Sequence, residues 1–231
     1  MQSFDLFPRQ RQEIVPGAVH IPDWLALVDQ HALVERCREW SRGPAGLRTP
    51  RMPDGTLMSI RSVCLGWHWY PYAYSATCDD HDGEPVKPLP ADIAALADRA
   101  AREAGFTIEP GRYDSSIVNV YDHASKLGLH QDIGESAETI ASGSPVVTIS
   151  LGDTCIFRFG NSETRTRPWH DVELRSGDLF VFGGPARLAF HGVVRTIPNS
   201  APPELELRDT RISITLRESG MSSSATAEPT A

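Results

Sequence analysis

The sequence predicts an α+β fold in which two helices precede a double-stranded β-helix (jelly roll). After Gly105, seven short apolar runs follow one another, bounded by Gly, Pro and Asp. This pattern is typical of an antiparallel sandwich or jelly roll. Before Gly105, two segments space their apolar residues for one buried helical face. The predicted strands are residues 116–121, 146–151, 154–159, 171–174, 179–182, 188–194 and 211–216.

Each predicted helix has a recognisable end. The first is expected over about residues 23–40, and Gly43-Pro44 stops it. The second is expected over about residues 90–104, where Gly105 suits the left-handed position that follows a helix. Residues 48–88, between the helices, are rich in aromatic residues, Gly and Pro, and they predict short strands and loops.

The length of 231 residues suits one structural unit with three parts. Residues 1–105 form the N-terminal part with the helices, and residues 106–217 form the jelly-roll core. Within the core, the polar stretch 133–144 predicts a loop. Residues 218–231 are small, polar and non-periodic, which predicts a disordered tail.

Composition limits where the chain works and what it binds. No apolar run is long enough to cross a bilayer, and the first residues lack the apolar stretch of a secretory signal, so we expect a cytoplasmic protein. The four cysteines form no C-x-x-C pair, which predicts reduced thiols. A net charge of −8 argues against nonspecific coating of duplex DNA but allows local basic patches.

The sequence contains a candidate metal site in His130-Gln131-Asp132. Residues two apart in an extended segment point to the same side, so this imidazole and this carboxylate can hold one metal ion. His191, in another strand-like run, is the best candidate for a second imidazole. Two histidines and one carboxylate form the facial triad of non-haem Fe(II) oxygenases. The alternative is a chance H-x-D, because lone histidines are usually surface or satisfied core residues.

A second pattern lies in residues 211–217, RISITLR. Arg211, Ser213 and Arg217 share one face of the predicted strand, while the isoleucines and the leucine face the other way. Two inward arginines would each need an anion, and a dicarboxylate would provide one. The alternative is a strand whose polar face is solvated.

Together these motifs resemble the AlkB family of Fe(II)- and 2-oxoglutarate-dependent oxygenases. The resemblance includes an N-x-Y motif, the H-x-D motif and an R-x-N-x-T-x-R signature, all in the family's order. The matching stretches are residues 4–7, 58–59, 65–67, 72–75, 119–121, 126–132, 147–152, 157–160, 177–184, 191–193 and 211–217. The resemblance implies a nucleotide-recognition lid within residues 1–105.

The resemblance also implies roles for single residues. His130, Asp132 and His191 would hold Fe(II), and Arg211 would pair with the distal carboxylate of 2-oxoglutarate. The remaining residues implied to bind this cosubstrate are Asn119, Tyr121, Ser213 and Arg217. Those implied to contact nucleic acid are Met58, Trp67, Tyr72, Lys126, His130, Gln131 and Glu135. Trp67 and His130 would sandwich a flipped base, and Tyr72, Lys126 and Gln131 would steady the phosphate backbone.

Two positions depart from the family's pattern. Ser213 stands where the signature has Asn, and its hydroxyl has a shorter reach. Gly134 stands where the family often has an acidic residue that reads the edge of the base. Glu135 is the candidate to replace it.

The implied function is oxidative demethylation of N-alkylated bases of the 1-methyladenine and 3-methylcytosine type in DNA or RNA, with release of formaldehyde. Fe(II), 2-oxoglutarate and O2 would be required, nucleic acid would be the partner, and the chain would act as a monomer. Two alternatives stay open. One is a related oxygenase acting on a protein or small molecule, and the other is a non-catalytic jelly roll that binds nucleic acid.

Overall fold

The computed structural model describes residues 8–71 and 73–221. The family-like start at residues 4–7, the lid residue Tyr72 and residues 222–231 lie outside this part. The helices are α1 (Leu27–Trp40), α2 (Ala91–Glu103) and the short α3 (Ala137–Ala141), with 3-10 turns η1 (Gly184–Ala186) and η2 (Pro203–Leu205).

The strands form two sheets and a separate hairpin. The seven-stranded sheet contains, in spatial order, β1 (Gln12–Val15), β2 (Ala18–Ile21), β11 (Leu179–Phe182), β8 (Val146–Gly152), β13 (Thr210–Arg217), β6 (Ser115–Asp122) and β3 (Arg61–Leu65). The four-stranded sheet contains β10 (His170–Leu174), β9 (Thr154–Phe159), β12 (His191–Ile197) and β7 (Leu127–His130). The hairpin is β4 (His68–Tyr70) with β5 (Ala73–Ser75).

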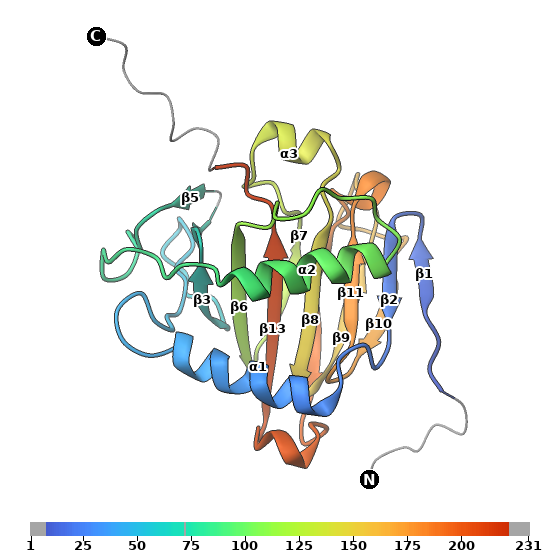
Figure 1. The fold of residues 1–231 in the computed structure, drawn as a ribbon, viewed down its shortest axis with the longest axis horizontal. Helices are drawn as coiled ribbons and strands as arrows, with labels where there is room; N and C mark the ends of the chain where they lie inside the picture. Colours follow the sequence, from blue (N-terminus) through green and yellow to red (C-terminus); the bar gives the residue numbers. More distant parts are fainter. Residues whose placement is uncertain (1–7, 72, 222–231) are drawn as a thin grey trace.

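This arrangement confirms the predicted jelly roll with flanking helices. Helices α1 and α2 lie across one face of the seven-stranded sheet (Figure 1). One apolar core joins these helices to the sheet, and its members include Leu33, Ala97 and Ile214. A second core, between the two sheets, is rich in phenylalanine and includes Phe157, Phe159 and Phe180. The seven predicted strands all bury side chains, which explains why the sequence pattern identified them, whereas β1 and β7 bury none.

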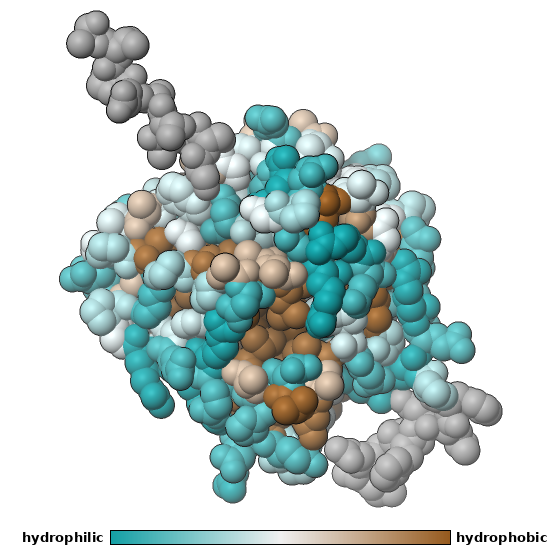
Figure 2. Space-filling model, viewed as in Figure 1, coloured by the Kyte–Doolittle hydropathy of each residue, from teal (hydrophilic) through white to brown (hydrophobic). Residues whose placement is uncertain are grey.

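Each of the two long helices buries one face, although α1 also exposes Leu27 and Val28. Figure 2, viewed as Figure 1, shows hydrophilic outer surfaces on this face with apolar residues visible between them. Helix α1 begins at Leu27, four residues later than predicted, because Asp23 has a positive φ of 52° that a helix cannot contain. Helix α2 begins one residue later than predicted and ends at Glu103.

Three parts of the fold differ from the prediction. Strands β1, β2 and β7 are only four residues long each and were not predicted, because such runs are too short to show a period. The predicted loop 133–144 contains helix α3, which Ser136 caps by accepting a hydrogen bond from the Thr139 N–H. Strand β12 begins at His191 rather than at 188.

The packed part of the chain extends past residue 217. Ser219 is buried, and its N–H and Oγ donate to the two oxygens of Asp114 at 2.6 and 2.7 Å. The division at residues 105 and 217 stays a prediction. Within residues 8–71 and 73–221, no helix is long and apolar enough to span a membrane.

Asp178, just before β11, is a buried anchor for the N-terminal segment. Its carboxylate accepts two 2.7 Å hydrogen bonds from Arg9, lies 2.9 Å from His20 Nε2, and accepts from the N–H groups of Asp23 and Arg175. Burial raises the pKa of Asp178, but the hydrogen bonds from His20 and Arg9 outweigh this and hold the pKa below its usual range.

We expect Asp178→Asn to lower the free energy of unfolding by about 3 kcal/mol, because it removes the buried carboxylate that pairs with the partly buried Arg9 and contacts the buried His20. The matched control Asp23→Asn removes an exposed partner of Arg9 and should cost less than about 1 kcal/mol. A carboxyl with a lowered folded-state pKa stabilises the fold above its unfolded pKa of about 4 and loses this contribution as pH falls below it. Urea denaturation should therefore show the Asp178→Asn deficit at pH 7 and a smaller one near pH 3. An equal deficit at both values would contradict this account.

Candidate active site

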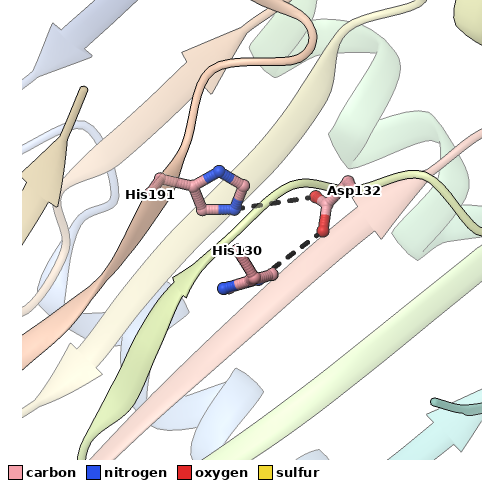
Figure 3. A group of neighbouring side chains, drawn as sticks. All are labelled: His130, Asp132 and His191. Atoms are coloured by element: carbon pink, nitrogen blue, oxygen red, sulfur yellow. Dashed lines mark ion pairs between the residues drawn. The ribbon is translucent and has the colours of Figure 1, made fainter. Parts of the chain in front are cut away.

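Strand register brings the predicted metal ligands together. His130 on β7 lies directly opposite His191 on β12, and Asp132 follows two residues after His130. His130 Nε2 lies 3.7 Å from Asp132 Oδ1, and His191 Nε2 lies 3.8 Å from Asp132 Oδ2. One candidate ligand atom from each residue lies within 4.8 Å of the other two (Figure 3). Three ligands at this spacing can hold one metal ion on one side.

Backbone carbonyls orient both imidazoles. His130 Nδ1 lies 2.9 Å from Gly128 O, and His191 Nδ1 lies 2.9 Å from Ala189 O. A carbonyl only accepts, so each Nδ1 carries the hydrogen and each Nε2 presents its lone pair to the centre. Burial, and then the neighbouring His130, lower the pKa of His191 to about 4, which keeps it in the neutral, metal-binding form.

Two arginine residues bind Asp132, one at its carboxylate and one at its backbone carbonyl. Arg217 Nη2 and Nε lie 2.9 and 3.0 Å from its Oδ2, and Arg187 Nη1 donates to its backbone carbonyl at 2.8 Å. Burial raises the pKa of Asp132, but the charges of Arg217 and the two histidines outweigh this, and the pKa lies below its usual range. The carboxylate is therefore ionised, as a metal ligand must be.

The predicted arginine face of β13 is buried, so a solvated polar face is wrong. Arg211 is only 1% exposed, and its guanidinium lies 4.9 Å from the centre of the Tyr121 ring. Its Nη2 donates to Ser150 Oγ at 3.1 Å, while Nε and Nη1 are buried without a hydrogen-bond partner. A buried guanidinium with two unsatisfied donors suits a carboxylate ligand.

The other predicted cosubstrate residues lie beside Arg211. Across β13 and β6, Arg211 is opposite Tyr121 and Ser213 is opposite Asn119, so the four side chains share one face. Burial raises the pKa of Tyr121 to about 12, so its phenol stays protonated and can donate. Arg217 lies on the same face of β13 as Arg211 and Ser213, at the end of the strand where it contacts the metal ligand Asp132.

A cavity of about 300 Å³ opens over two of the metal ligands, His130 and Asp132. Its walls are largely apolar and come from the 48–71 segment, β6, β7 and the loop after Asp132. The lining residues are Met52, Met58, Ile60, Trp69, Pro71, Ile117, Asn119, Leu127, Gly128, Leu129, His130, Gln131, Asp132, Ile133, Gly134, Glu135, Arg165 and Arg217. An apolar cavity with a few convergent polar groups is the usual form of a small-molecule site.

Known proteins resemble this chain over most of its length. A model of the 2OG-Fe(II) oxygenase superfamily matches residues 17–217. The AlkB homolog of Caulobacter vibrioides, named an alpha-ketoglutarate-dependent dioxygenase, is 36% identical over 88% of both chains. The AlkB dioxygenase of Escherichia coli is 34% identical over 73% of this chain and 75% of its own.

The chain belongs to the AlkB family.

Longer relatives and one solved structure agree with this assignment. The Arabidopsis thaliana DNA N(6)-methyladenine demethylase ALKBH1D is 36% identical over 88% of this chain, which spans about half the length of that relative. The solved structure of OsALKBH1 is 34% identical, with a TM-score of 0.77, and the match covers 89% of this chain and all of that one.

Membership in the AlkB family implies Fe(II), 2-oxoglutarate and O2, and this chain's residues fit them. The two imidazole Nε2 atoms and the Asp132 carboxylate are within reach of one ion, and they leave coordination positions open. The unsatisfied Nε and Nη1 of Arg211 fit a carboxylate of 2-oxoglutarate.

The predicted nucleic-acid contacts are distributed differently. Met58, Gln131 and Glu135 line the cavity, and Lys126 is exposed at the start of β7. Trp67, predicted to stack on the base, is half-buried outside the cavity lining, and Trp69 lines the cavity instead. Trp67 lies in the bend before β4, whereas Trp69 lies within β4, so the two rings are placed by different parts of the backbone.

Two of the residues predicted to contact nucleic acid, Gln131 and Lys126, also form hydrogen bonds to neighbouring segments of the chain. The Gln131 amide donates to the carbonyls of Leu188 at 2.6 Å and Ser162 at 3.1 Å. The Lys126 N–H donates to Ser59 Oγ at 2.9 Å, which fixes the segment carrying Met58 beside β7. Both residues therefore shape the cavity through their own contacts.

Sequence reasoning missed a buried polar cluster beneath the hairpin. His68 is fully buried with Nε2 2.6 Å from Asp80, and Arg48 lies 3.2 Å from the same carboxylate. Arg48 also donates to the carbonyl of Trp69. Burial of an arginine and a histidine next to one aspartate is a long-range arrangement that no local motif reveals.

Proposed function

We propose that this chain removes methyl groups oxidatively from N-alkylated bases in DNA or RNA, as a monomer that takes the base in flipped form. The observation that carries the proposal is the metal triad at the cavity with Trp69 in the wall. A flat indole beside an oxidising centre suits a base, because every base can stack on an aromatic face. The names of the relatives, which include nucleic acid dioxygenase and DNA N(6)-methyladenine demethylase, support the same substrate class.

His130, Asp132 and His191 would hold Fe(II), and Arg211 would hold the distal carboxylate of 2-oxoglutarate. When bound, Fe(II), 2-oxoglutarate and O2 supply the oxidation: 2-oxoglutarate takes up one oxygen atom and becomes succinate and CO2, and the other oxygen atom enters a C–H bond of the N-methyl group. The hydroxymethyl group then leaves as formaldehyde. Its hydroxyl proton is released to solvent when the base is a ring-nitrogen cation and passes to the nitrogen when the methyl group was on a neutral exocyclic amine.

The chain's own residues position and enclose the reactants. Asn119, Tyr121 and Arg217 lie along the row that begins at Arg211, where they can hydrogen-bond the cosubstrate. Trp69 would stack on the base, with Met58 packed beside it. The exposed Lys126 would contact a phosphate as a point charge. The lid hairpin over the cavity would exclude water during the oxidation.

Formaldehyde release tests this proposal directly. We expect release from a single-stranded oligonucleotide that carries 3-methylcytosine or another N-methylated base, with Fe(II), 2-oxoglutarate and O2, and none after addition of a chelator. Succinate formed only with a methylated peptide or a small molecule would instead assign the oxygenase another substrate. Metal and oligonucleotide binding without any succinate would indicate a non-catalytic binding module.

The same assay separates the two candidate stacking residues. Trp69→Ala should raise KM for the oligonucleotide at least about fivefold, because stacking on one base contributes roughly 1–3 kcal/mol. Trp67→Ala is the matched control and should change KM by less than about twofold on the same scale. The reverse order would return the stacking role to Trp67, as the family resemblance implies.

A further inference from the structure

The segment 132–135 connects a metal ligand to the lid hairpin, and one arginine holds both of its ends. Arg187 Nη1 donates to the backbone carbonyl of Asp132 at 2.8 Å, and Arg187 Nη2 lies 3.0 Å from Glu135 Oε2. Arg187 follows the 3-10 turn η1 directly and is 2% exposed. Its planar guanidinium therefore fixes the position of Glu135 relative to Asp132.

Glu135 in turn contacts the hairpin. Its Oε1 accepts a 3.0 Å hydrogen bond from the hydroxyl of Tyr74 on β5. Tyr74 lies directly opposite Trp69 of β4, so the two rings share one face of the hairpin. A Cβ atom on Gly134 would lie 3.2 Å from Cε2 of Tyr74 and 3.9 Å from Nε1 of Trp69, so both rings lie against the segment. The position of the hairpin therefore depends on residues 132–135.

The charges of this cluster are buried and balanced. Arg217 lies 2.9 Å from Asp132 Oδ2 and 3.4 Å from Glu135 Oε1, so two guanidinium groups face two carboxylates. The side chain of Glu135 is only 1% exposed. The contact between Arg187 and Glu135 is an ion pair without a hydrogen bond, because Glu135 Oε2 has no hydrogen-bond partner. A buried ion that moves away from its partner is costly, so a shift of one of these groups displaces the others.

We propose that Arg187, Glu135 and Tyr74 are positioning residues that set the place of the Trp69 ring relative to the metal ligands. The inference rests on the proposed function, because Trp69 is the ring that would stack on the base. Arg187 and Tyr74 lie outside the cavity lining, so they act through other residues. A shift of the base by about 1 Å would move its methyl group out of reach and can lower the rate of demethylation about a hundredfold.

The oxidation of 2-oxoglutarate should survive such a shift, because its proposed contacts lie along β13 and β6 rather than on the hairpin. The reaction would then become uncoupled. 2-Oxoglutarate would still give succinate and CO2, and the second oxygen atom would leave as water. The two electrons for this step come from a reductant such as ascorbate, which the assay must contain, and the two protons come from solvent. Formaldehyde would therefore fall relative to succinate.

Hydrogen exchange tests the connection without any substrate. Mn(II) and 2-oxoglutarate should fix Asp132, and the connection should pass this order on to the hairpin. We expect the amides of β4 and β5 to exchange at least about threefold more slowly after this addition in the wild-type chain, but less than about 1.5-fold more slowly in Tyr74→Phe. The matched control Tyr113→Phe removes a 3.0 Å hydrogen bond to the Pro145 carbonyl, outside the cavity lining, and should keep the wild-type slowing. No slowing in the wild type, or equal slowing in Tyr74→Phe, would overturn the inference.

Arg187→Lys tests the other end of the connection. Lysine keeps a positive charge beside Glu135 but lacks the fork that also reaches the carbonyl of Asp132. With a methylated oligonucleotide and ascorbate, we expect formaldehyde per succinate to fall at least about threefold, and KM for 2-oxoglutarate to stay within about twofold. Tyr74→Phe should lower the same ratio, and Arg195→Lys, at an exposed position of β12, should leave it unchanged.

A purely structural role would lower both products together. An unchanged ratio in Arg187→Lys and Tyr74→Phe would therefore overturn the inference. If the wild-type chain releases no formaldehyde from any methylated oligonucleotide, the proposed function fails, while hydrogen exchange still decides whether the hairpin and the metal site are connected. If Arg187→Lys does not fold, Tyr74→Phe decides the question, because its ring keeps the packing against Gly134.

Discussion

Asp132→Ala should abolish the proposed demethylation, with a loss of at least about a thousandfold in kcat/KM. The substitution removes the only carboxylate of the triad and leaves two imidazoles, which cannot hold Fe(II) in the facial arrangement. His130→Ala should have an effect of the same order, because it removes an Nε2 ligand whose orientation the Gly128 carbonyl fixes. Fe(II) binding, measured by equilibrium dialysis, should fall together with formaldehyde release. The turnover of 2-oxoglutarate to succinate should fall as well.

Asp171→Ala is the matched control for Asp132→Ala. Asp171 is exposed on β10 and pairs with Arg158 at 2.7 Å, so its loss should leave activity within about twofold. The fold of Asp132→Ala should persist, since Arg217 keeps Glu135 as a partner 3.4 Å away. Full activity of Asp132→Ala, or normal Fe(II) binding by it, would place the metal site elsewhere.

The metal site could be predicted because two of its ligands lie two residues apart in one extended segment. H-x-D puts an imidazole and a carboxylate on one side of an extended segment, and this holds whatever the rest of the fold does. The pairing that places His130 on β7 directly opposite His191 on β12 could not be derived from sequence spacing. Strand β7 is four residues long and was not predicted. The sequence therefore indicated His191 as the best candidate from its strand-like run, and the family resemblance implied the same ligand.

The arginine row of β13 was predictable for the same reason. Alternation over residues 211–217 separates polar from apolar side chains, and burial of Arg211 and Arg217 predicts that each faces an anion or the site of an anionic ligand. The partners found in the structure differ in kind. Arg217 meets Asp132, a residue 85 positions away in the sequence, whereas Arg211 meets one hydroxyl and keeps two donors unsatisfied. Alternation alone does not distinguish these two cases.

The orientation of the aromatic residues in the lid hairpin, β4–β5, could not be predicted from local sequence patterns. Five aromatic residues lie within eight positions, and sequence alone does not decide which of them faces the cavity. Trp69 does so because Arg48, itself fixed by Asp80, donates to its carbonyl, and because Gly134 allows the hairpin to approach. Arg187 was missed too, although a lone cation after Gly183-Gly184 in a buried region must find an anion. These contacts join segments far apart in the chain, and their effect on a side chain's direction cannot be read from neighbours.

Arg211→Met should raise KM for 2-oxoglutarate by about a hundredfold, because a charge-assisted, forked contact to a carboxylate contributes roughly 3 kcal/mol. The thermal stability of the ligand-free protein, by contrast, should stay the same or increase in this variant. The guanidinium is 1% exposed, with Nε and Nη1 unsatisfied, so the protein without ligand carries a desolvation cost at this site. Methionine has a similar volume and no such cost. Thermal unfolding without 2-oxoglutarate should therefore occur at the same or a higher temperature in the variant.

The two opposite responses separate a ligand-binding role for Arg211 from a structural one. Isothermal titration with 2-oxoglutarate in the presence of Mn(II), without turnover, should show the loss of affinity directly. Arg195→Met, at an exposed position of β12, is the matched control and should leave both affinity and unfolding temperature nearly unchanged. If Arg211→Met lowered the unfolding temperature and kept the affinity, Arg211 would serve the fold. A buried arginine kept at a cost to stability, and needed for cosubstrate binding, is what the unsatisfied guanidinium predicts.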